Sequence, residues 1–171
     1  MSFYFAYGSN INEKQMRFRM RPRVEYGISK SGTCKLIGAA ILPNYELVFD
    51  VPDDHVDGAG YANIQRSKGS FVCGAIYEVD ATALRLLDIY ECVPVLYKRG
   101  KIKATLIKAT TSIIDGIITG TKLSAIAYVG NKKPTRKGLK PTKRYLKRIL
   151  RGKLHLPKDY IKKLEKLETI D

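Results

Sequence analysis

The chain has 171 residues, of which 44% are hydrophobic, so it is long enough for one domain with a real core and does not have the composition of a disordered protein. No stretch reaches the roughly 18 apolar residues of a membrane span, and the first residues lack the features of a secretory signal peptide. The cysteines Cys34, Cys73 and Cys92 are odd in number and widely spaced, which argues against a disulfide framework. We therefore expect a cytoplasmic protein with a single domain over residues 1–171.

Positive charge is concentrated towards the C-terminal end of the chain. The net charge is +15, and residues 131–171 hold 15 Lys and Arg against 4 Asp and Glu. Such a block can bind nucleic acid or another polyanion by neutralising phosphates, or it can be a solvated helical face. We favour the solvated face because no nucleic-acid motif accompanies the charge. The aromatic residues of this region, Tyr145 and Tyr160, also lie at positions that we expect in the core.

The N-terminal segment predicts a strand, a turn and a short helix. Residues 3–8 are strand-like and aromatic, and they end abruptly in the small residues Gly8-Ser9-Asn10. A helix is predicted over residues 12–20 with Asn12 as its N-cap. The abrupt stop fits an ordinary turn, and it equally fits a place where the backbone approaches a ligand.

The next patterns predict two hairpins and two later strands. The hairpins are expected around two turn dipeptides, Pro43-Asn44 and Lys68-Gly69. Their strands cover residues 33–42 with 45–51, and residues 61–67 with 71–79. Later strands with partial period-two alternation are predicted over residues 101–110 and 123–130, while residues 112–120 fit either a strand or a loop.

Three further helices are predicted from caps and from apolar spacing. The first covers residues 80–91, with Asp80 as the cap and with Leu84 and Leu87 along one side. The second covers residues 142–152 and stops at Gly152. The third covers residues 157–168, with Pro157 in its first turn. The whole pattern predicts an α+β domain with a mostly antiparallel, curved sheet or small β-barrel and flanking helices, in which residues 131–171 form a basic helical extension.

Metal and thiol chemistry find little support in the sequence. His55 and His155 lie far apart, and neither CxxC nor HExxH occurs, so no metal site is predicted. The acidic stretch 53–58 lacks the residues of a calcium loop, and we interpret it as a solvated loop. Cys92 has no histidine in a recognisable context to act as its base, so we expect a buried, inert cysteine.

Glu91 and the Gly8-Ser9-Asn10 turn are the remaining candidates for chemistry. Glu91 ends the helix predicted over 80–91, on or beside its core face. A carboxylate there would be partly desolvated, which raises its pKa and suits it to carry a proton, although surface glutamates are common. The Gly-Ser-Asn loop can direct successive backbone N–H groups at an anion, or it can be a plain turn.

Together these segments resemble the gamma-glutamylcyclotransferase family. The resemblance rests on YFAYGSN near the N-terminus, on GAIYEVD-x-x-x-LRLLDIYE ending at Glu91, on the following Tyr97, and on AIAYVGN around Tyr128. The C-terminal YLKRILRGKLHLPKDYIKKLEKL also looks like the ending of that family. The resemblance to the family spans nearly the whole chain.

The resemblance implies a set of site residues and two departures. The catalytic residue would be Glu91, and the substrate-binding residues would be Tyr7, Gly8, Ser9, Asn10, Tyr97 and Tyr128. The backbone amides of the loop would receive a glutamyl α-carboxylate, and Glu91 would act as acid and base. The chain departs from the family at Cys92, where Gly is frequent, and in the slightly shortened segment that follows it.

The activity implied by the resemblance is a cofactor-free cyclisation. A γ-glutamyl compound would close to 5-oxoproline and release a free amine or amino acid, without a metal or an organic cofactor. γ-Glutamyl amino acids, γ-glutamyl amines and glutathione are the candidate substrates. The alternatives are a non-catalytic ligand-binding relative and a basic nucleic-acid-associated protein acting through residues 131–171. The sequence indicates no oligomeric state.

Overall fold

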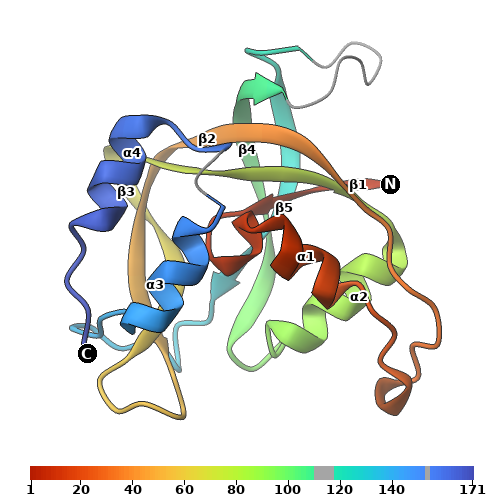
Figure 1. Cartoon of the computed structure of the whole chain (residues 1–171), viewed down its shortest axis with the longest axis horizontal. Helices are drawn as coiled ribbons and strands as arrows, with labels where there is room; N and C mark the ends of the chain where they lie inside the picture. The colour runs from red at the N-terminus through yellow and green to blue at the C-terminus, as the bar shows by residue number, and fades with distance from the viewer. Residues whose placement is uncertain (110–117, 153–154) are drawn as a thin grey trace.

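Five β-strands close into a small barrel in the computed structural model, which describes residues 1–109, 118–152 and 155–171 (Figure 1). The strands are β1 (Ser2–Ala6), β2 (Cys34–Pro52), β3 (Gly60–Val79), β4 (Tyr97–Ala109) and β5 (Lys122–Gly130). Their order is β1-β3-β2-β4-β5, and neighbours are antiparallel except β1 and β5, whose parallel pairing closes the barrel. The predicted α+β fold with a curved, mostly antiparallel sheet is confirmed.

Strands β2 and β3 form one long antiparallel pair, so the prediction of two hairpins is wrong. The register shifts after Pro43, where Asn44 faces residues 67–70 of β3. Asn44 has a φ of 60° and Gly69 a φ of 81°, and Asn44 Oδ1 accepts a hydrogen bond of 3.1 Å from Gly69 N. Both dipeptides therefore lie in the same irregular part of one continuous β2–β3 pairing. They look like turns in sequence because a β-bulge uses the same left-handed backbone as a turn. The chain reverses instead at residues 53–59, between β2 and β3.

The helices of the described part of the chain are η1 (Ser9–Ile11), α1 (Glu13–Arg19), η2 (Val24–Tyr26), α2 (Ala81–Tyr90), α3 (Lys143–Leu150) and α4 (Lys158–Glu165). The four α-helices agree with the sequence patterns, whereas η2 was not predicted. The predicted caps are confirmed: Asn12 Oδ1 accepts from Lys14 N at 3.0 Å, and Asp80 Oδ1 accepts from Ala83 N at 2.7 Å. Most of residues 112–120 lie outside the described residues.

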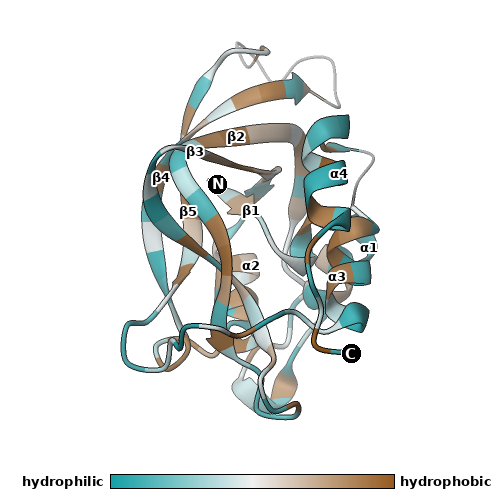
Figure 2. Ribbon diagram, turned by 90° about the vertical axis from the view of Figure 1, so that its left-hand side faces the viewer, coloured by the Kyte–Doolittle hydropathy of each residue, from teal (hydrophilic) through white to brown (hydrophobic). Residues whose placement is uncertain are grey.

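The helices cover one side of the barrel and complete its core. Figure 2 shows α1, α3 and α4 along that side, and it shows hydrophobic and hydrophilic residues alternating along β4 and β5. α3 buries Leu146 and Ile149, and α4 buries Tyr160 and Leu164. Within the ranges that the structure describes, no helix has the length and apolar character needed to cross a membrane.

The end of α3 packs directly on the N-terminal segment. A Cβ atom on Gly152 would lie 2.7 Å from the carbonyl carbon of Ile11 and 2.9 Å from Asn12 N, closer than such contacts occur. Gly152 ends the helix as predicted, and its lack of a side chain also permits this close approach. The C-terminal helices therefore support the turn that follows β1.

Candidate active site

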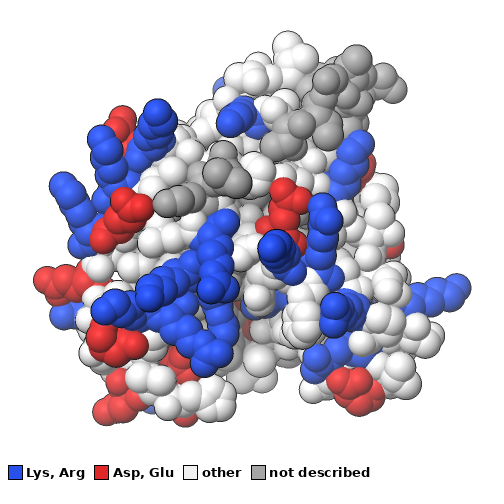
Figure 3. Space-filling model, viewed as in Figure 1, with Lys and Arg blue, Asp and Glu red and all other residues white. Residues whose placement is uncertain are grey.

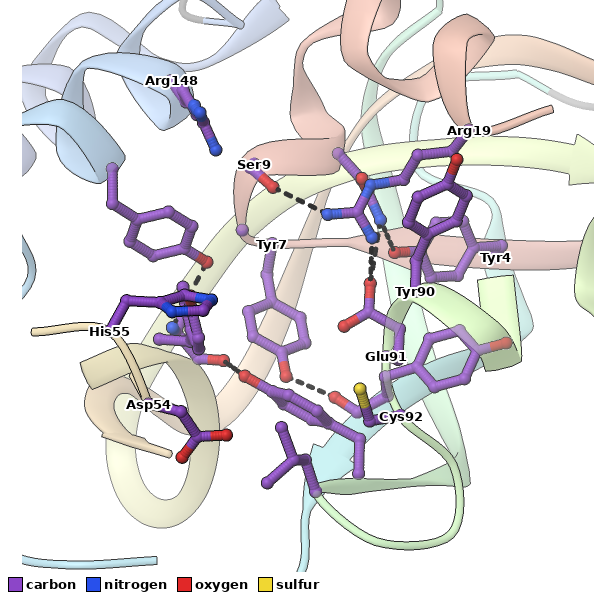
Figure 4. A pocket seen from close by; sticks show the side chains of 18 residues that line it. Tyr4, Tyr7, Ser9, Arg19, Asp54, His55, Tyr90, Glu91, Cys92 and Arg148 are labelled. Atoms are coloured by element: carbon purple, nitrogen blue, oxygen red, sulfur yellow. Dashed lines mark hydrogen bonds and ion pairs between the residues drawn. The ribbon is translucent and has the colours of Figure 1, made fainter. Parts of the chain in front are cut away.

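One cavity of about 290 Å³ brings together residues from distant parts of the chain (Figure 4). It is lined by every site residue that the resemblance implies, namely Tyr7, Gly8, Ser9, Asn10, Glu91, Tyr97 and Tyr128. Asn10 and Glu91 are 81 positions apart in sequence and are joined by a hydrogen bond. The barrel therefore assembles, at the end of β1, the groups that the sequence presents separately.

Glu91 is the carboxylate in the interior of this cavity. It directly follows α2, and its N–H donates to Leu87 O at 2.9 Å, which fixes its backbone. Glu91 Oε1 accepts hydrogen bonds from Asn10 Nδ2 (3.1 Å) and Arg19 Nη1 (3.0 Å). The side chain is 16% exposed, and Oε2 has no hydrogen-bond partner among the described residues. One oxygen of Glu91 is thus held while the other is free to exchange a proton.

The surroundings of Glu91 shift its proton affinity upwards. Burial raises the pKa of Glu91 above its ordinary value, although the charge of Arg19 and the hydrogen bonds from Asn10 and Arg19 lower it. Burial also raises the pKa of the neighbouring Tyr4 and Tyr7 hydroxyls, so both remain protonated near neutral pH. A carboxyl group with a raised pKa can both accept and return a proton near neutral pH.

Arg19 is a site residue that sequence reasoning missed. It ends α1 with a side chain only 14% exposed, its guanidinium lies 4.9 Å from the centre of the Tyr90 ring, and Nη2 lies 3.5 Å from Ser9 Oγ. Arg17, on the same helix, is 76% exposed. The available signal was spacing, because Arg19 follows the buried Met16 by three residues and so shares its face.

The turn after β1 is held rigidly by side chains. Tyr7 OH donates to the main-chain oxygen of Tyr128, and Asn10 Nδ2 also donates to Tyr4 OH at 2.9 Å. The N–H groups of Ser9 and Asn10 begin η1 and therefore have no acceptor within it. Successive N–H groups at the wall of a cavity are suited to bind an anion such as a carboxylate.

The tyrosines of the cavity have different roles in its geometry. Tyr97 OH donates to Ala62 O at 2.8 Å, and Tyr145 OH accepts from Ala62 N at 3.3 Å, so one residue of β3 fixes two rings. Tyr128 OH donates to Asp88 Oδ1 at 2.9 Å, on α2. Tyr128 thus contributes its ring to the cavity while its hydroxyl is bound outside it.

The opposite side of the cavity is formed by a more exposed group, here called the outer wall: Asp54, His55, Tyr61 and Arg148. Asp54 and His55 belong to the turn between β2 and β3, which is exposed as expected for a solvated loop. Arg148 extends from α3 towards the cavity (Figure 4). Figure 3 shows the basic residues gathered over α3. The charged C-terminal region therefore contributes to the cavity in addition to the solvent-exposed surface.

Cys92 lies on the rim of the cavity and is exposed, so the expectation of a buried cysteine is wrong. The physical reason is its backbone, which has a φ of 48° immediately after the end of α2. Its carbonyl oxygen accepts hydrogen bonds from Val95 N (2.7 Å) and Leu96 N (2.9 Å) in the following turn. A left-handed residue at this position after a helix is usually Gly, which gives a physical reason for the Gly that the resemblance implies at position 92.

Metal ligands do not cluster in the described ranges, which hold no group of three or more His, Cys, Asp or Glu side chains arranged to bind an ion. The acids and bases of the cavity come from separate elements, with Glu91 after α2 and with Asp54 and His55 in the β2–β3 turn. The cavity contains a carboxylate, a guanidinium, hydroxyl groups and backbone donors, which are groups suited to binding and proton transfer.

Comparison with protein families identifies the kind of chain that carries this cavity. A model of the family described as "Gamma-glutamyl cyclotransferase, AIG2-like" matches residues 4–147. The chain belongs to this family. The resemblance stated from YFAYGSN and the downstream Glu91 is thereby confirmed at the level of the family. No curated protein matches the chain in sequence.

Solved structures share the fold of this cyclotransferase family member. A protein titled "Gamma-glutamyl cyclotransferase" matches with a TM-score of 0.77 and 22% identity, over 99% of this chain and 89% of the other. An uncharacterized protein from Homo sapiens matches with a TM-score of 0.76 and 22% identity, over the same shares of 99% and 89%. YkqA from Bacillus subtilis matches with a TM-score of 0.70 and 18% identity, over 98% of this chain and 55% of that protein. At such identities the likeness concerns the fold.

Proposed function

We propose that this family member cyclises a γ-glutamyl compound, forming 5-oxoproline and releasing a free amine or amino acid. One observation carries the proposal: Glu91, partly buried and with Oε2 free, shares a cavity with Ser9 and Asn10, whose N–H groups have no acceptor within η1. A proton carrier and an anion-binding turn are the two parts that this reaction needs. Family membership supports the same class of chemistry.

The reaction is an intramolecular aminolysis. The α-amine of the substrate attacks its own γ-carbonyl carbon, a C–N bond closes a five-membered ring, and the original γ-amide C–N bond breaks. The α-ammonium must first lose a proton, and the leaving nitrogen must gain one. Since the nucleophile is already tethered, holding one reactive conformation accounts for much of the rate acceleration.

Each group of the cavity has a place in this scheme. The N–H groups of Ser9 and Asn10 hold the α-carboxylate, which orients the α-amine towards Glu91. Glu91 takes the proton from the ammonium through Oε2 and gives it to the leaving nitrogen, so one carboxyl group serves both steps. Backbone donors can also stabilise the negative charge that develops on the γ-carbonyl oxygen. The scheme uses only groups of this chain.

The test is release of 5-oxoproline from a panel of γ-glutamyl compounds: a γ-glutamyl amino acid, a γ-glutamyl amine and glutathione. Glu91→Gln keeps the size of the side chain and removes the proton carrier, so we expect a loss of roughly a hundredfold or more. Glu25→Gln is the matched control, because Glu25 is 59% exposed and does not line the cavity. Equal release by the wild type and Glu91→Gln would contradict the role of Glu91.

The panel also separates catalysis from binding. Binding of 5-oxoproline without release from any substrate by the wild type would indicate a ligand-binding relative with the same cavity. Release from one class of substrate alone would identify the leaving group.

A further inference from the structure

Arg19 is held less completely than a buried arginine usually is. Its Nη1 donates to Glu91 Oε1 at 3.0 Å, but Nη2 has only the 3.5 Å contact with Ser9 Oγ. Its Nε is buried without a hydrogen-bond partner in the described part of the chain. A guanidinium has five N–H donors arranged as a fork that matches a carboxylate. The present contacts therefore leave room for a second anionic partner.

Arg19 also lies between the two working parts of the cavity. Figure 4 shows its guanidinium with Ser9 on one side and Glu91 on the other. Ser9 belongs to the turn that receives the substrate carboxylate under the proposed function, so an anion bound there comes within reach of Arg19. The ring of Tyr90, 4.9 Å from the guanidinium, provides a flat surface against which it can shift without losing contact.

We propose that Arg19 is a positioning residue with two alternating partners, pairing with Glu91 in the free protein and with the α-carboxylate of the ligand in the complex. This inference rests on the proposed function for the place of the carboxylate, and it adds a residue that the sequence comparison does not supply. In the free protein Arg19 lowers the pKa of Glu91 and so favours the ionised form that accepts a proton. In the complex the carboxylate pairs with Arg19, so Arg19 no longer competes with the substrate ammonium for Glu91.

The sign of the effect follows from the charges. Arg19 lowers the pKa of Glu91, against the larger upward effect of burial. Engaging Arg19 with another anion weakens this lowering, so the pKa of Glu91 rises when an anion without an ammonium group, such as 5-oxoproline, binds. Replacing Arg19 with an uncharged residue removes the lowering permanently, so the pKa of Glu91 is already high in the free variant and changes less on binding.

The tyrosines around Glu91 do not contribute to the acidic side of a pH profile. Tyr4, Tyr7, Tyr97 and Tyr145, which come from β1, the turn after it, β4 and α3, all have a raised pKa, about 12 for Tyr145. The remaining charged or titratable groups that line the cavity are Arg19, Asp54, His55, Tyr61, Tyr90, Cys92, Tyr128 and Arg148. Of these, Asp54 and His55 are exposed on the outer wall, and they are unchanged in every Arg19 variant, so any contribution from them is common to all the proteins compared.

The experiment compares the pH dependence of kcat/KM with that of kcat for 5-oxoproline release. The first reports the free enzyme and the second reports the complex. The substrate ammonium lowers the pKa of Glu91 in the complex of every variant, so the separation between the two limbs is compared across variants. We expect the acidic limb of kcat, relative to that of kcat/KM, to lie at higher pH in the wild type than in Arg19→Met, in which the limb of kcat/KM moves to higher pH. Arg19→Lys keeps the charge, so it keeps the separation while kcat/KM falls, because Lys lacks the fork.

The control is Arg17→Met, the same substitution on the same helix at a residue that is 76% exposed and outside the cavity. Its two limbs should match those of the wild type. If Arg19→Met lowers activity with both limbs unmoved, Arg19 acts only as a static support and the inference is overturned. A fold defect is identified separately, since it would lower the thermal unfolding midpoint of Arg19→Met.

A second measurement distinguishes failure of this inference from failure of the proposed function. The enthalpy of 5-oxoproline binding is measured by calorimetry in two buffers that differ in ionisation enthalpy. The difference between the two values gives the number of protons that the protein takes up on binding. Uptake by the wild type that falls in Arg19→Met supports the inference even if no substrate is turned over. Equal proton uptake by both proteins overturns the inference about Arg19 but does not contradict the proposed cyclisation. Absence of binding by the wild type also overturns the inference about Arg19.

Discussion

The two sides of the cavity are built in opposite ways. At the inner end, formed by Tyr4, Asn10, Arg19 and Glu91, the side chains are buried or nearly so and hydrogen-bonded to one another. On the outer wall, Asp54 and His55 are exposed and come from a turn. Buried side chains that are hydrogen-bonded to one another accept only one ligand geometry, whereas exposed loop residues can accept ligand groups of different shape. The difference suggests a constant head group at the inner end and a variable leaving group at the outer wall.

The largest effect tests whether the inner end acts as one unit. We expect Glu91→Gln to reduce kcat roughly a hundredfold and the double variant Glu91→Gln with Arg19→Met to lose little more in kcat. Groups in direct contact are not additive, and without Glu91 the exchange of partners by Arg19 has no consequence for proton transfer. The measurement is kcat for the four proteins of this cycle. Losses that simply multiply would show that the two residues act independently.

A smaller effect tests the outer wall. Arg148→Ala should raise KM about fivefold for a γ-glutamyl amino acid, whose leaving part carries a carboxylate, because a partly exposed ion pair contributes about 1 kcal/mol. The kcat should stay constant, and a γ-glutamyl amine should show no change. Lys147→Ala is the control, since Lys147 is exposed on the same helix and does not line the cavity. An equal change for both substrates would mean that Arg148 does not contact the leaving group.

The boundary between the two sides offers a test of stability. Cys92 has a φ of 48°, a backbone conformation that costs a residue with a Cβ about 1 kcal/mol. Cys92→Gly should therefore raise the free energy of unfolding by roughly 0.5 kcal/mol, after the greater unfolded-state entropy of Gly is subtracted. Urea unfolding measures this, with Cys92→Ala as the control that keeps the strain. A gain in Cys92→Ala as large as in Cys92→Gly would assign the effect to loss of the thiol.

The smallest effect concerns how stability depends on pH. Because the pKa of Glu91 is raised in the folded state, the folded protein binds this proton more tightly than the unfolded chain does. The corresponding stability is fully present below the unfolded pKa and is lost as pH rises through the folded pKa. Glu91→Gln has no such proton, so the stability of the wild type relative to this variant should fall as pH rises. Urea unfolding of both proteins between about pH 4 and pH 8 tests the sign.

The sequence predicted helices better than the path of the sheet, and the reason is local. The caps Asn12 and Asp80 act through side-chain bonds to residues two or three positions away, so their effect is visible in a short stretch. Pro43-Asn44 and Lys68-Gly69 gave equally clear local signals, and the positive φ angles of Asn44 and Gly69 are real. A left-handed residue can either reverse the chain or produce a bulge within a strand. Which of the two occurs depends on the strand that pairs with it, and neither segment alone contains this information.

The candidate site shows the same division. Glu91 and the turn of Gly8-Ser9-Asn10 were found from helix position and from turn chemistry, and both line the cavity. Arg19 was missed because nothing nearby in sequence distinguishes it from Arg17, and its partner is 72 positions away. A search for a cation on the buried face of a helix, prompted by a desolvated carboxylate, would have found it.

The contact of Gly152 with Ile11 has a consequence for the order in which the protein is made. The turn of Gly8-Ser9-Asn10 is synthesised long before α3, which supports it. Tyr145, whose hydroxyl bonds to Ala62 in the wall, also belongs to this late segment. The cavity is therefore completed only after α3 has emerged, through contacts of long sequence separation that form slowly. A partly synthesised chain that has already paired strands β1 to β5 thus still lacks one wall of its cavity, and any activity should appear only once α3 has packed in place.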